Sequence, residues 1–374
     1  MWSYWEKESF IGKPDLLVIG SGIVGLNAAL EYKQNNPNAN IIVLEAGHLP
    51  SGASTKNAGF ACFGSPSELL MDLENASEEL VLSLLEKRLK GLERLRTLLG
   101  DNKLEYLEPG SFELFTSEDA DTYNNCIENL SELNQKVRKQ IGFEPYEIRT
   151  DVIDKFGFSG MMGAIQVKGE GQINTGKMMF NLIELAKSKG IQILNGIEAN
   201  NLTQNEHTAT VNTSFGNIEA AKCLIATNGF GKELIGEVDL NPARAQVLIT
   251  KPIENLNIEG TFHFDCGYYY FRNINNRILF GGGRNLDYEG ETTSENKLND
   301  KIQNALTSIL KEKILPNTTH EVDYRWTGIM GVGENKKAIV KQLDKNIFCS
   351  VKLGGMGVAI GSLIGQEAAI LMQD

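Results

Sequence analysis

The sequence predicts an α/β protein in which a domain with a parallel sheet is interleaved with an α+β domain built on a mostly antiparallel sheet. Three observations predict this class. Glycine-rich turns lead into helical patterns near both ends of the chain, "VIGSGIVGLNAA" at 18–29 and "LGGMGVAIGSLIGQEAA" at 353–369. The sequence between them alternates leucine-rich helical patterns with tyrosine-rich strands. The 374 residues are also enough for two domains with separate cores.

Composition and charge exclude several functional classes. The net charge is −12 and no lysine or arginine cluster occurs, so we expect no nucleic acid partner. Five scattered cysteines and four distant histidines predict neither a disulfide framework nor a metal site. The opening "MWSYWEKESF" has no apolar signal segment, and no apolar run reaches the ~18 residues that span a bilayer. We therefore expect a cytoplasmic protein without a membrane span.

Residues 15–32, "DLLVIGSGIVGLNAALEY", predict the first strand and helix of the parallel-sheet domain. In the turn between them, Gly20 would permit the tight bend and Gly22 the approach of a pyrophosphate to the backbone. Gly25 would let the helix pack closely on the strand. Free N–H groups at the helix N-terminus would bind the phosphate charge. The motif therefore predicts a Rossmann-like dinucleotide site.

Glu45 ends the second predicted strand, "NIIVLEA" at 40–46, twenty positions after Gly25. A carboxylate at this position accepts hydrogen bonds from ribose hydroxyls and repels a 2′-phosphate, which disfavours NADP. NAD and FAD both remain open at this point. The next segment, "SGASTKNAGF" at 51–60, is rich in small residues that let a flat or bulky group lie against the backbone.

This segment resembles the second FAD segment of the D-amino-acid oxidase superfamily, which includes glycine, sarcosine and γ-glutamylputrescine oxidases. "GASTKNAGF" is similar, residue by residue, to the GASGRNGG of the last group. The resemblance extends over most of the chain, through "CLIATNGFG" at 223–231, "NPARAQVLIT" at 241–250, "YYYFRNINNRILFGGGRN" at 268–285 and "RWTGIMGVG" at 325–333.

The resemblance implies a Rossmann-like FAD-binding domain of the glutathione-reductase type, interleaved with the substrate domain. We expect residues 1–74, 158–240 and 321–374 to form the FAD-binding domain. Residues 75–157 and 241–320 would form the substrate domain. The FAD is expected to be non-covalent, because the linking cysteine of sarcosine oxidases is absent. Dimethylglycine dehydrogenases carry a flavin-linked histidine at the position of Lys56.

The resemblance also implies contacts along the whole cofactor. The hydroxyl of Ser54 and neighbouring amides would meet the pyrophosphate, Asn57–Phe60 the isoalloxazine, and a backbone group near Ala199 the adenine. The C-terminal element would lie next to the first strand and start its helix near Val358, with the helix N-terminus aimed at the pyrimidine side of the flavin. Helix dipole and amides there favour the charge of the reduced ring. The expected cofactor residues are Gly20, Ser21, Gly22, Ile23, Val24, Gly25, Leu44, Glu45, Ala46, Gly52, Ala53, Ser54, Asn57, Ala58, Gly59, Phe60, Ala199, Ala226, Thr227, Gly229, Gly354, Gly355, Met356, Gly357 and Val358.

Local patterns predict further elements between the glycine-rich ends. Residues 67–100 predict two helices with a buried leucine stripe, and 104–116 predict a strand pair broken at Pro109-Gly110. Residues 177–202 predict a helix that stops near Gly190, followed by a strand.

The turn signal "NINN" predicts a hairpin of strands at 268–272 and 277–282. Alternation puts Tyr268, Tyr270 and Arg272 on one face and Tyr269 and Phe271 on the other. Periodicity leaves open which face meets the flavin, and the presence of Arg272 favours the first.

For the reaction, the resemblance implies oxidation of a C–N bond by hydride transfer to flavin N5, without an obligatory side-chain base. Glycine and D-amino-acid oxidases carry an arginine in W-x-G-x-R that binds the substrate carboxylate. This chain has Met330 at that position, after Trp326 and Gly328. We therefore expect an amine or larger N-substituted compound as substrate, with pocket candidates Tyr270, Arg272, Met330 and Lys56.

Two other functions stay open. One is a 2-hydroxy-acid dehydrogenase of the same fold that passes electrons to a quinone or protein. The other is a non-catalytic flavoprotein or subunit of a complex. The expected partners are a small amine or amino-acid-like substrate and oxygen or another electron acceptor, and the sequence leaves their identity and the oligomeric state open.

Overall fold

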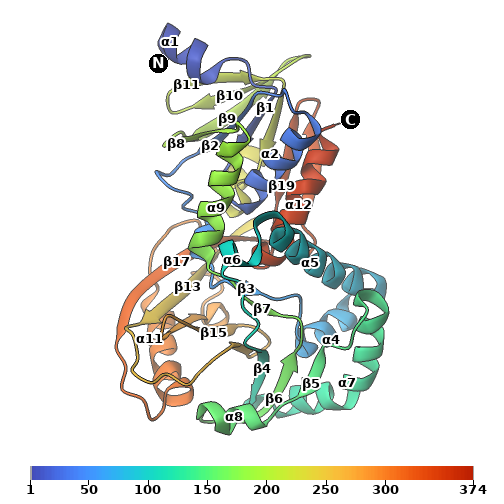
Figure 1. Ribbon diagram of the computed structural model, residues 1–374, viewed down its shortest axis with the longest axis vertical. Helices are drawn as coiled ribbons and strands as arrows, with labels where there is room; N and C mark the ends of the chain where they lie inside the picture. The colour runs from blue at the N-terminus through green and yellow to red at the C-terminus, as the bar shows by residue number, and fades with distance from the viewer. Residues whose placement is uncertain (1, 374) are drawn as a thin grey trace.

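Two large sheets, one in each half of the molecule, organise residues 2–373, which the computed structural model describes (Figure 1). The upper half contains a six-stranded sheet in the order β18-β19-β12-β1-β2-β8. The lower half contains an eight-stranded sheet in the order β17-β13-β16-β15-β14-β4-β6-β5. Both ends of the chain lie in the upper half (Figure 1). Within residues 2–373, no helix combines the length and apolarity required to cross a membrane.

The six-stranded sheet is parallel except at β18. Its central strand β1 pairs with β2 on one side and β12 on the other. The inner residues of all three strands are apolar, which is typical of strands covered on both faces. The C-terminal strand β19 pairs with β12, so β12 separates it from β1; the expectation that it lies next to the first strand is wrong. The strands are β1 (Leu16–Ile19), β2 (Ile41–Glu45), β8 (Gln192–Asn195), β12 (Lys222–Ile225), β18 (Ile339–Asp344) and β19 (Ile347–Val351).

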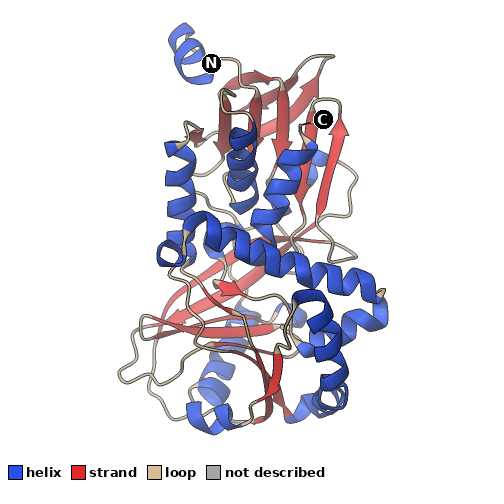
Figure 2. Cartoon of the chain, turned by 45° about the vertical axis from the view of Figure 1, so that its right-hand side comes forward, coloured by secondary structure: helices blue, strands red, loops and turns tan. Residues whose placement is uncertain are grey.

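Helices cover this sheet, and Figure 2 shows several of them in front of its strands. The helix of the N-terminal element, α2 (Ile23–Asn35), packs on the C-terminal helix α12 (Gly357–Leu371), which also packs on α5 (Glu78–Leu99). Glycines set these crossings. A Cβ on Gly365 of α12 would lie 2.7 Å from the carbonyl oxygen of Val24, and one on Gly91 of α5 would lie 2.1 Å from that of Ala359. The glycine-rich C-terminal run therefore serves close helix packing in addition to its turn.

The expected helices of the middle segments are confirmed. Residues 67–100 form α4 (Pro66–Asn75) and α5, in which Leu82, Leu85, Leu92, Leu95 and Leu99 are buried and Leu80 is exposed. Helix α9 (Thr175–Ser188) ends before Gly190, which has φ +76°, and β8 follows it. The other helices are α1 (Tyr4–Glu6), η1 (Lys7–Ile11), α3 (Ala53–Lys56), α6 (Asp101–Leu104), η2 (Ser117–Asp119), α7 (Ala120–Ile141), α8 (Asp151–Phe156), η3 (Asn228–Phe230), α10 (Lys232–Ile235), η4 (Arg284–Leu286), α11 (Asp300–Ile309) and η5 (Leu310–Ile314).

The eight-stranded sheet is antiparallel except where β4 pairs with β14. The hairpin of β15 and β16 turns at Asn275 and Asn276, which have φ of 49° and 56° as a tight two-residue hairpin requires, so this prediction is confirmed. The strands are β4 (Ser111–Thr116), β5 (Tyr146–Ile148), β6 (Met161–Val167), β13 (Asn241–Thr250), β14 (Thr261–Phe264), β15 (Tyr269–Ile274), β16 (Arg277–Gly282) and β17 (Val322–Val332). Two smaller sheets contain β9 (Ala199–Gln204), β10 (Ala209–Thr213) and β11 (Gly216–Ala220), and β3 (Phe60–Ala61) with β7 (Gly171–Gln172).

The structure corrects two expectations in this half. Strands β6 and β17 belong to the eight-stranded sheet, because β6 pairs with β4 and β5 and β17 pairs with β13 along its length. The ranges 158–240 and 321–374, expected in the FAD-binding domain, therefore contain strands of the other sheet. The strand pair expected at 104–116 is also wrong: residues 101–104 are helical, Leu107 makes one isolated bridge to Gln172, and only β4 is a strand.

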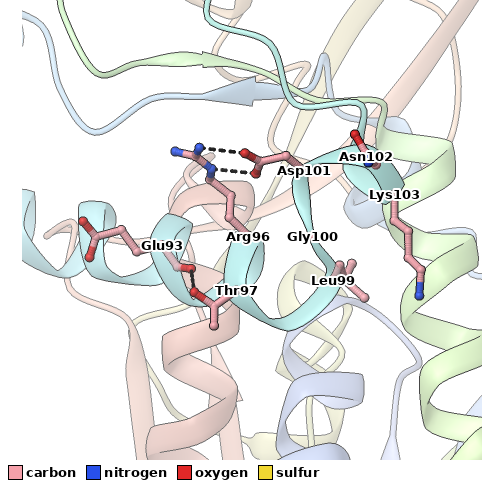
Figure 3. Close-up of a pocket in the computed structure, with 8 residues that line it drawn as sticks. All are labelled: Glu93, Arg96, Thr97, Leu99, Gly100, Asp101, Asn102 and Lys103. Atoms are coloured by element: carbon pink, nitrogen blue, oxygen red, sulfur yellow. Dashed lines mark hydrogen bonds and ion pairs between the residues drawn. The ribbon is translucent and has the colours of Figure 1, made fainter.

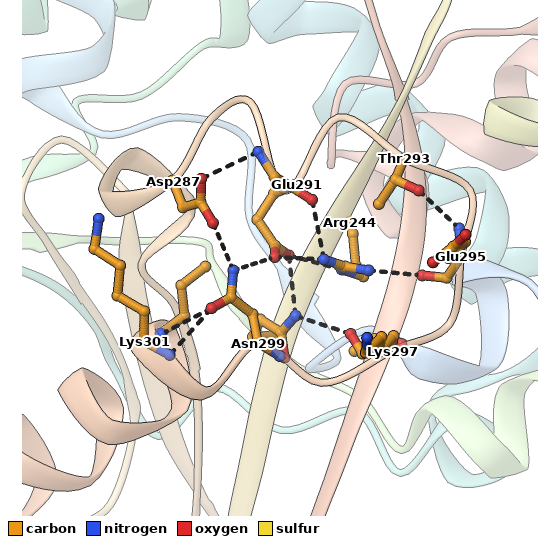
Figure 4. Close-up of polar contacts among 12 residues, drawn as sticks. Arg244, Asp287, Glu291, Thr293, Glu295, Lys297, Asn299 and Lys301 are labelled. Atoms are coloured by element: carbon orange, nitrogen blue, oxygen red, sulfur yellow. Dashed lines mark hydrogen bonds and ion pairs between the residues drawn. The ribbon is translucent and has the colours of Figure 1, made fainter.

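A buried polar network fastens residues 287–299, between η4 and α11, onto β13 (Figure 4). Glu291 is fully buried, and its carboxylate accepts hydrogen bonds from Arg244 Nη2 at 2.8 Å, Gln246 Nε2 at 3.0 Å and Asn299 Nδ2 at 2.8 Å. Because Arg244 and Glu291 compensate each other's charge, both tolerate burial. The network covers the face of β13 that points away from Val247.

Candidate functional site

The glycine turn after β1 has the geometry that the sequence predicted. Gly20 has φ +105°, and a Cβ there would lie 2.8 Å from the carbonyl oxygen of Ala226 on the neighbouring strand. A Cβ on Gly25 would lie 2.0 Å from the carbonyl oxygen of Gly20. The predicted roles of Gly20 in the bend and Gly25 in helix packing are therefore confirmed.

The N-terminus of α2 is open to an anion at the carboxyl ends of β1 and β12. The N–H of Ile23 donates to Ser54 Oγ at 3.0 Å, whereas the N–H groups of Val24 and Gly25 have no acceptor within residues 2–373. Ser54 Oγ would also lie 2.9 Å from a Cβ on Gly22, so only glycine lets the two segments meet. Unpaired N–H groups and the positive helix end are suited to a phosphate group.

Glu45 lies beside the same turn, at the end of β2. Its side chain is buried, and Oε2 accepts hydrogen bonds from Ser21 Oγ at 2.7 Å and Ser21 N at 3.3 Å. Oε1 accepts one from Gly47 N at 3.0 Å. Two carboxylate oxygens offer about four acceptor positions, so room remains for a ribose hydroxyl. The N–H of Ile197, two residues before Ala199, donates to the backbone oxygen of Glu45.

The segment 57–60 lies between the two halves of the molecule. Asn57 Oδ1 accepts from Gly59 N at 2.9 Å and from Thr175 Oγ1 at 3.0 Å, which fixes the bend. Trp326 Nε1, from β17, donates to the backbone oxygen of Lys56 at 2.9 Å. The segment that the sequence assigned to the ring is thus held by side chains from both halves.

The C-terminal turn closes the site from the other side. Gly354 and Gly355 have φ of 56° and 83°, and α12 begins at Gly357, one residue before the expected start. Met330 Sδ would lie 3.4 Å from a Cβ on Gly355, and Gly229 packs against the backbone oxygen of Met330. The structure therefore brings the turn, the 226–229 segment and the position of the expected arginine together.

These features fit a bound adenine dinucleotide. Thr227 Oγ1 is buried without a hydrogen-bond partner among the described residues, and it belongs to the side chain that a Cβ on Gly20 would contact at 3.5 Å. An orphaned hydroxyl, an open helix N-terminus and an acidic strand end occur at the crevice where the strand order reverses between β1 and β12. This is the place where doubly wound sheets bind dinucleotides.

Tyr270 and Arg272 point from β15 toward the segment 57–60. The rings of Tyr270 and Phe60 meet edge to face at 5.8 Å, and Arg272 Nη1 donates to the backbone oxygen of Gly59 at 3.3 Å. Tyr269 and Phe271 pack instead into the core on the other face. Arg272 is 3% exposed. Within residues 2–373 it forms no salt bridge, and its Nε has no hydrogen-bond partner. Burial lowers the pKa of Arg272 to about 10.

Neither arginine near β17 replaces the missing one at Met330. Arg325 lies on the opposite face and donates to Thr307 Oγ1 of α11 at 3.0 Å. Arg272 pairs with Leu279, which in turn pairs with Ile249 of β13. Met330 pairs with Ala243, six residues away on the same strand. Six residues along a strand span about 20 Å, which exceeds the reach of the two side chains.

Two titratable residues on the same face of the sheet escaped the sequence analysis. Register places His263 of β14 directly opposite Tyr270 and also directly opposite Glu113 of β4. The carboxylate of Glu113 is buried and accepts hydrogen bonds from Ser65 Oγ, Ser67 Oγ and Ser67 N. The signal available in the sequence was a charged residue inside the alternating strand "SFELFT" and a histidine inside the apolar strand "TFHF".

A surface pocket lies apart from this site, where α5 meets α6 (Figure 3). It has a volume of about 640 Å³, and two of its lining side chains, Arg96 and Asp101, bind each other. Arg96 binds both carboxylate oxygens of Asp101 at 2.8 Å and covers the ring of Tyr106. None of the predicted site residues lines it.

Comparisons with known proteins agree with this geometry. Residues 15–371 match the model of the family described as DAO, FAD dependent oxidoreductase. The chain is 24% identical over 375 residues to γ-glutamylputrescine oxidoreductase of Escherichia coli K12, with 96% of this chain and 83% of that protein covered. It is 24% identical over 278 residues to glycine oxidase of Geobacillus kaustophilus, with 71% and 69% covered. Its fold matches the crystal structure of L-proline dehydrogenase from P. horikoshii with a TM-score of 0.76 at 18% identity, covering 96% and 93% of the two chains.

Proposed function

The chain belongs to the DAO family of FAD-dependent oxidoreductases, and we propose that it oxidises a C–N bond of an amine or of an N-substituted amino-acid derivative. It is an oxidoreductase and FAD is its cofactor. When bound, FAD supplies the hydride acceptor of the proposed reaction at its N5 atom. The residues that would hold it are those of the glycine turn, Glu45, the 52–60 segment and the start of α12.

The proposed substrate class rests on Met330. Simple α-amino acids need a charged partner for their carboxylate, and a bidentate arginine is the strongest one available to a protein. At Met330 the chain offers a thioether, and Arg272 and Arg325 are both directed elsewhere. This side of the proposed substrate site therefore offers a thioether and no cation, which favours an alkyl chain over a carboxylate.

The chain's own residues would act mainly by binding and orientation. Tyr270, Phe60 and Trp326 belong to one apolar cluster on the face of the sheet turned toward segment 57–60. Such walls exclude water, place the substrate carbon, and favour the neutral form of an amine because they cannot solvate its cation. The name of the E. coli relative, a γ-glutamylputrescine oxidoreductase, supports an amine substrate, and that of glycine oxidase supports the wider class of amino compounds.

Steady-state kinetics on glycine, D-alanine, sarcosine and a series of N-alkyl amines tests the proposal. We expect the amines to be the better substrates of the native enzyme. Met330→Arg should raise kcat/KM for the carboxylate substrates about ten- to a hundredfold, the worth of a charge-assisted hydrogen bond, whereas Met330→Leu should not. Efficient oxidation of glycine or D-alanine by the native enzyme contradicts the proposal. Turnover of 2-hydroxy acids alone would identify it as a dehydrogenase of that class.

A further inference from the structure

Arg272 is a buried positive charge that nothing among the described residues compensates. It keeps 3% exposure, and within residues 2–373 it forms no salt bridge. Loss of hydration is the one influence that lowers its pKa, to about 10, so the guanidinium stays charged at neutral pH and no neighbouring carboxylate acts on it. Buried charges are costly and are normally paired. An uncompensated charge of this kind indicates that a negative group comes from outside the chain.

The neighbours of Arg272 in the sheet leave most of its donors free. On β14 it faces Thr261, which is fully buried and whose Oγ1 has no hydrogen-bond partner within residues 2–373. On β16 it faces the apolar side chain of Leu279. Arg272 Nε is also unpaired in the described part of the chain, and Nη1 donates to the backbone oxygen of Gly59 at 3.3 Å. These surroundings screen the charge poorly.

Gly59 lets the guanidinium approach segment 57–60 closely. It has φ +75°, and a Cβ there would lie 2.4 Å from the backbone oxygen of Ile173 and 3.2 Å from Arg272 Nη1. This segment is the one that the sequence assigns to the isoalloxazine ring, and FAD is the cofactor. Arg272 thus holds its charge against the backbone that is expected beside the ring.

Reduction of the cofactor creates a negative charge on that ring. A hydride carries two electrons and one proton from the substrate carbon to N5, so the carbon is oxidised and the ring is reduced. The ring is neutral before the transfer and carries one negative charge after it. A fixed cation nearby stabilises the charged form and hardly changes the energy of the neutral form.

We propose that Arg272 supplies a positive potential that favours the reduced, anionic form of FAD and so raises the two-electron reduction potential of the bound cofactor. The charge acts through space from the eight-stranded sheet, on the side of segment 57–60. It therefore adds to the helix N-terminus that is expected at the pyrimidine side of the ring. The inference goes beyond the proposed amine oxidation, because it requires FAD and no particular substrate.

The reduction potential of the holoenzyme is the first test, measured against dyes of known potential. Arg272→Gln keeps a donor for Gly59 but removes the charge, whereas Arg272→Lys keeps the charge. At an effective dielectric constant of about 20, two unit charges roughly 10 Å apart change an equilibrium about tenfold. For a two-electron couple this corresponds to about 30 mV. Arg272→Gln should lower the potential by this amount, and Arg272→Lys should stay close to the native protein.

Sulfite affinity gives a second readout that needs no substrate. The lone pair of the sulfite sulfur forms a bond to N5 of the oxidised flavin, and the ring takes up the negative charge without any electron from another reagent. The dissociation constant, followed by bleaching of the flavin absorbance, should therefore rise about tenfold in Arg272→Gln and change little in Arg272→Lys.

Thr261 allows the charge to be neutralised while Arg272 stays in place. Because Thr261 lies directly opposite Arg272, Thr261→Asp would put a carboxylate beside the unpaired Nε. Its potential should fall as in Arg272→Gln, whereas the neutral Thr261→Asn should keep the native value. Thermal unfolding and flavin content show whether each variant retains the site, and the Thr261 pair carries the test where Arg272→Gln does not hold FAD.

Arg325→Gln is the matched control. Arg325 lies in the same sheet on the opposite face, where it donates to Thr307 Oγ1 at 3.0 Å. Its variant loses the same charge and should keep the native potential and sulfite affinity. Equal losses in Arg325→Gln and Arg272→Gln would reveal an effect of net charge alone and overturn the inference.

The remaining results separate the inference from the proposed function. Native potential and sulfite affinity in Arg272→Gln with FAD bound overturn the inference and leave the proposed function standing. A native potential with a raised KM for carboxylate substrates alone would assign the charge to a substrate carboxylate, which also overturns it. An enzyme that oxidises no amine contradicts the proposed function, whereas a lowered potential in Arg272→Gln and Thr261→Asp would still support the inference.

Discussion

Replacing Glu45 by alanine should weaken FAD binding while preserving the fold. The carboxylate accepts two hydrogen bonds from Ser21 and one from Gly47, and these place it at the ribose end of the glycine turn. Loss of one hydrogen bond between the ribose and a charged acceptor corresponds to about 1.5–3 kcal/mol, or roughly ten- to a hundredfold in Kd. Titration of the apoprotein with FAD, followed by quenching of flavin fluorescence, measures this change.

Two further variants separate the ribose contact from the shape of the turn. Ser21→Ala removes the 2.7 Å hydrogen bond to Glu45 but keeps the carboxylate, so its effect on Kd should be the smaller one. Glu45→Gln keeps one acceptor oxygen and should fall between the native protein and Glu45→Ala. An unchanged Kd for Glu45→Ala, with native far-UV circular dichroism, would refute the assignment of Glu45 to the ribose.

Three other predictions follow from the structure. The purified protein should be yellow, and acid precipitation should leave FAD in the supernatant; flavin that stays with the precipitate would show a covalent link. Gly365→Ala should destabilise the protein by about 1–3 kcal/mol in urea unfolding, because its Cβ would lie 2.7 Å from Val24 O. Gly357→Ala, where the nearest atom is 3.4 Å away, should be neutral or stabilising, so equal losses would contradict the packing argument. Glu113 has a folded-state pKa raised to about 7 from 4.5, so its contribution to stability is lost as the pH rises between these values, by up to about 3 kcal/mol. The melting temperature of Glu113→Gln relative to the native protein should therefore rise from pH 5 to pH 8, and a constant difference would count against the raised pKa.

The cofactor site could be predicted because its parts are local. A strand, a glycine turn and a helix follow each other within residues 15–32, and the φ of Gly20 and the contacts of Gly25 are consequences of that short connection. The acidic end of β2 follows at a fixed distance along the chain. Such signals depend only on residues that are close in sequence, so they can be recognised before the whole fold is known.

The pairing of His263 with Glu113 could not be predicted in the same way. The two residues are 150 positions apart, and only the order of strands in the sheet makes them neighbours. Alternation along "SFELFT" gives the face of Glu113 but not its partner strand. The same limit applies to β6 and β17: their patterns predict strands, and their membership of the eight-stranded sheet is decided by pairing with distant segments.

The glycine contacts between α2 and α12 also have a consequence for folding during translation. Gly365 fits against Val24, more than three hundred residues earlier, and the turn at Gly354 and Gly355 completes the site that the first strand begins. During translation the first strand and its helix emerge long before the helix that covers them. The N-terminal element must therefore wait, with an apolar helix face exposed, until the last helix has left the ribosome, and such exposure favours aggregation or binding by chaperones. FAD added during synthesis should speed folding only after that point, because the C-terminal turn and helix that complete its site are absent before then.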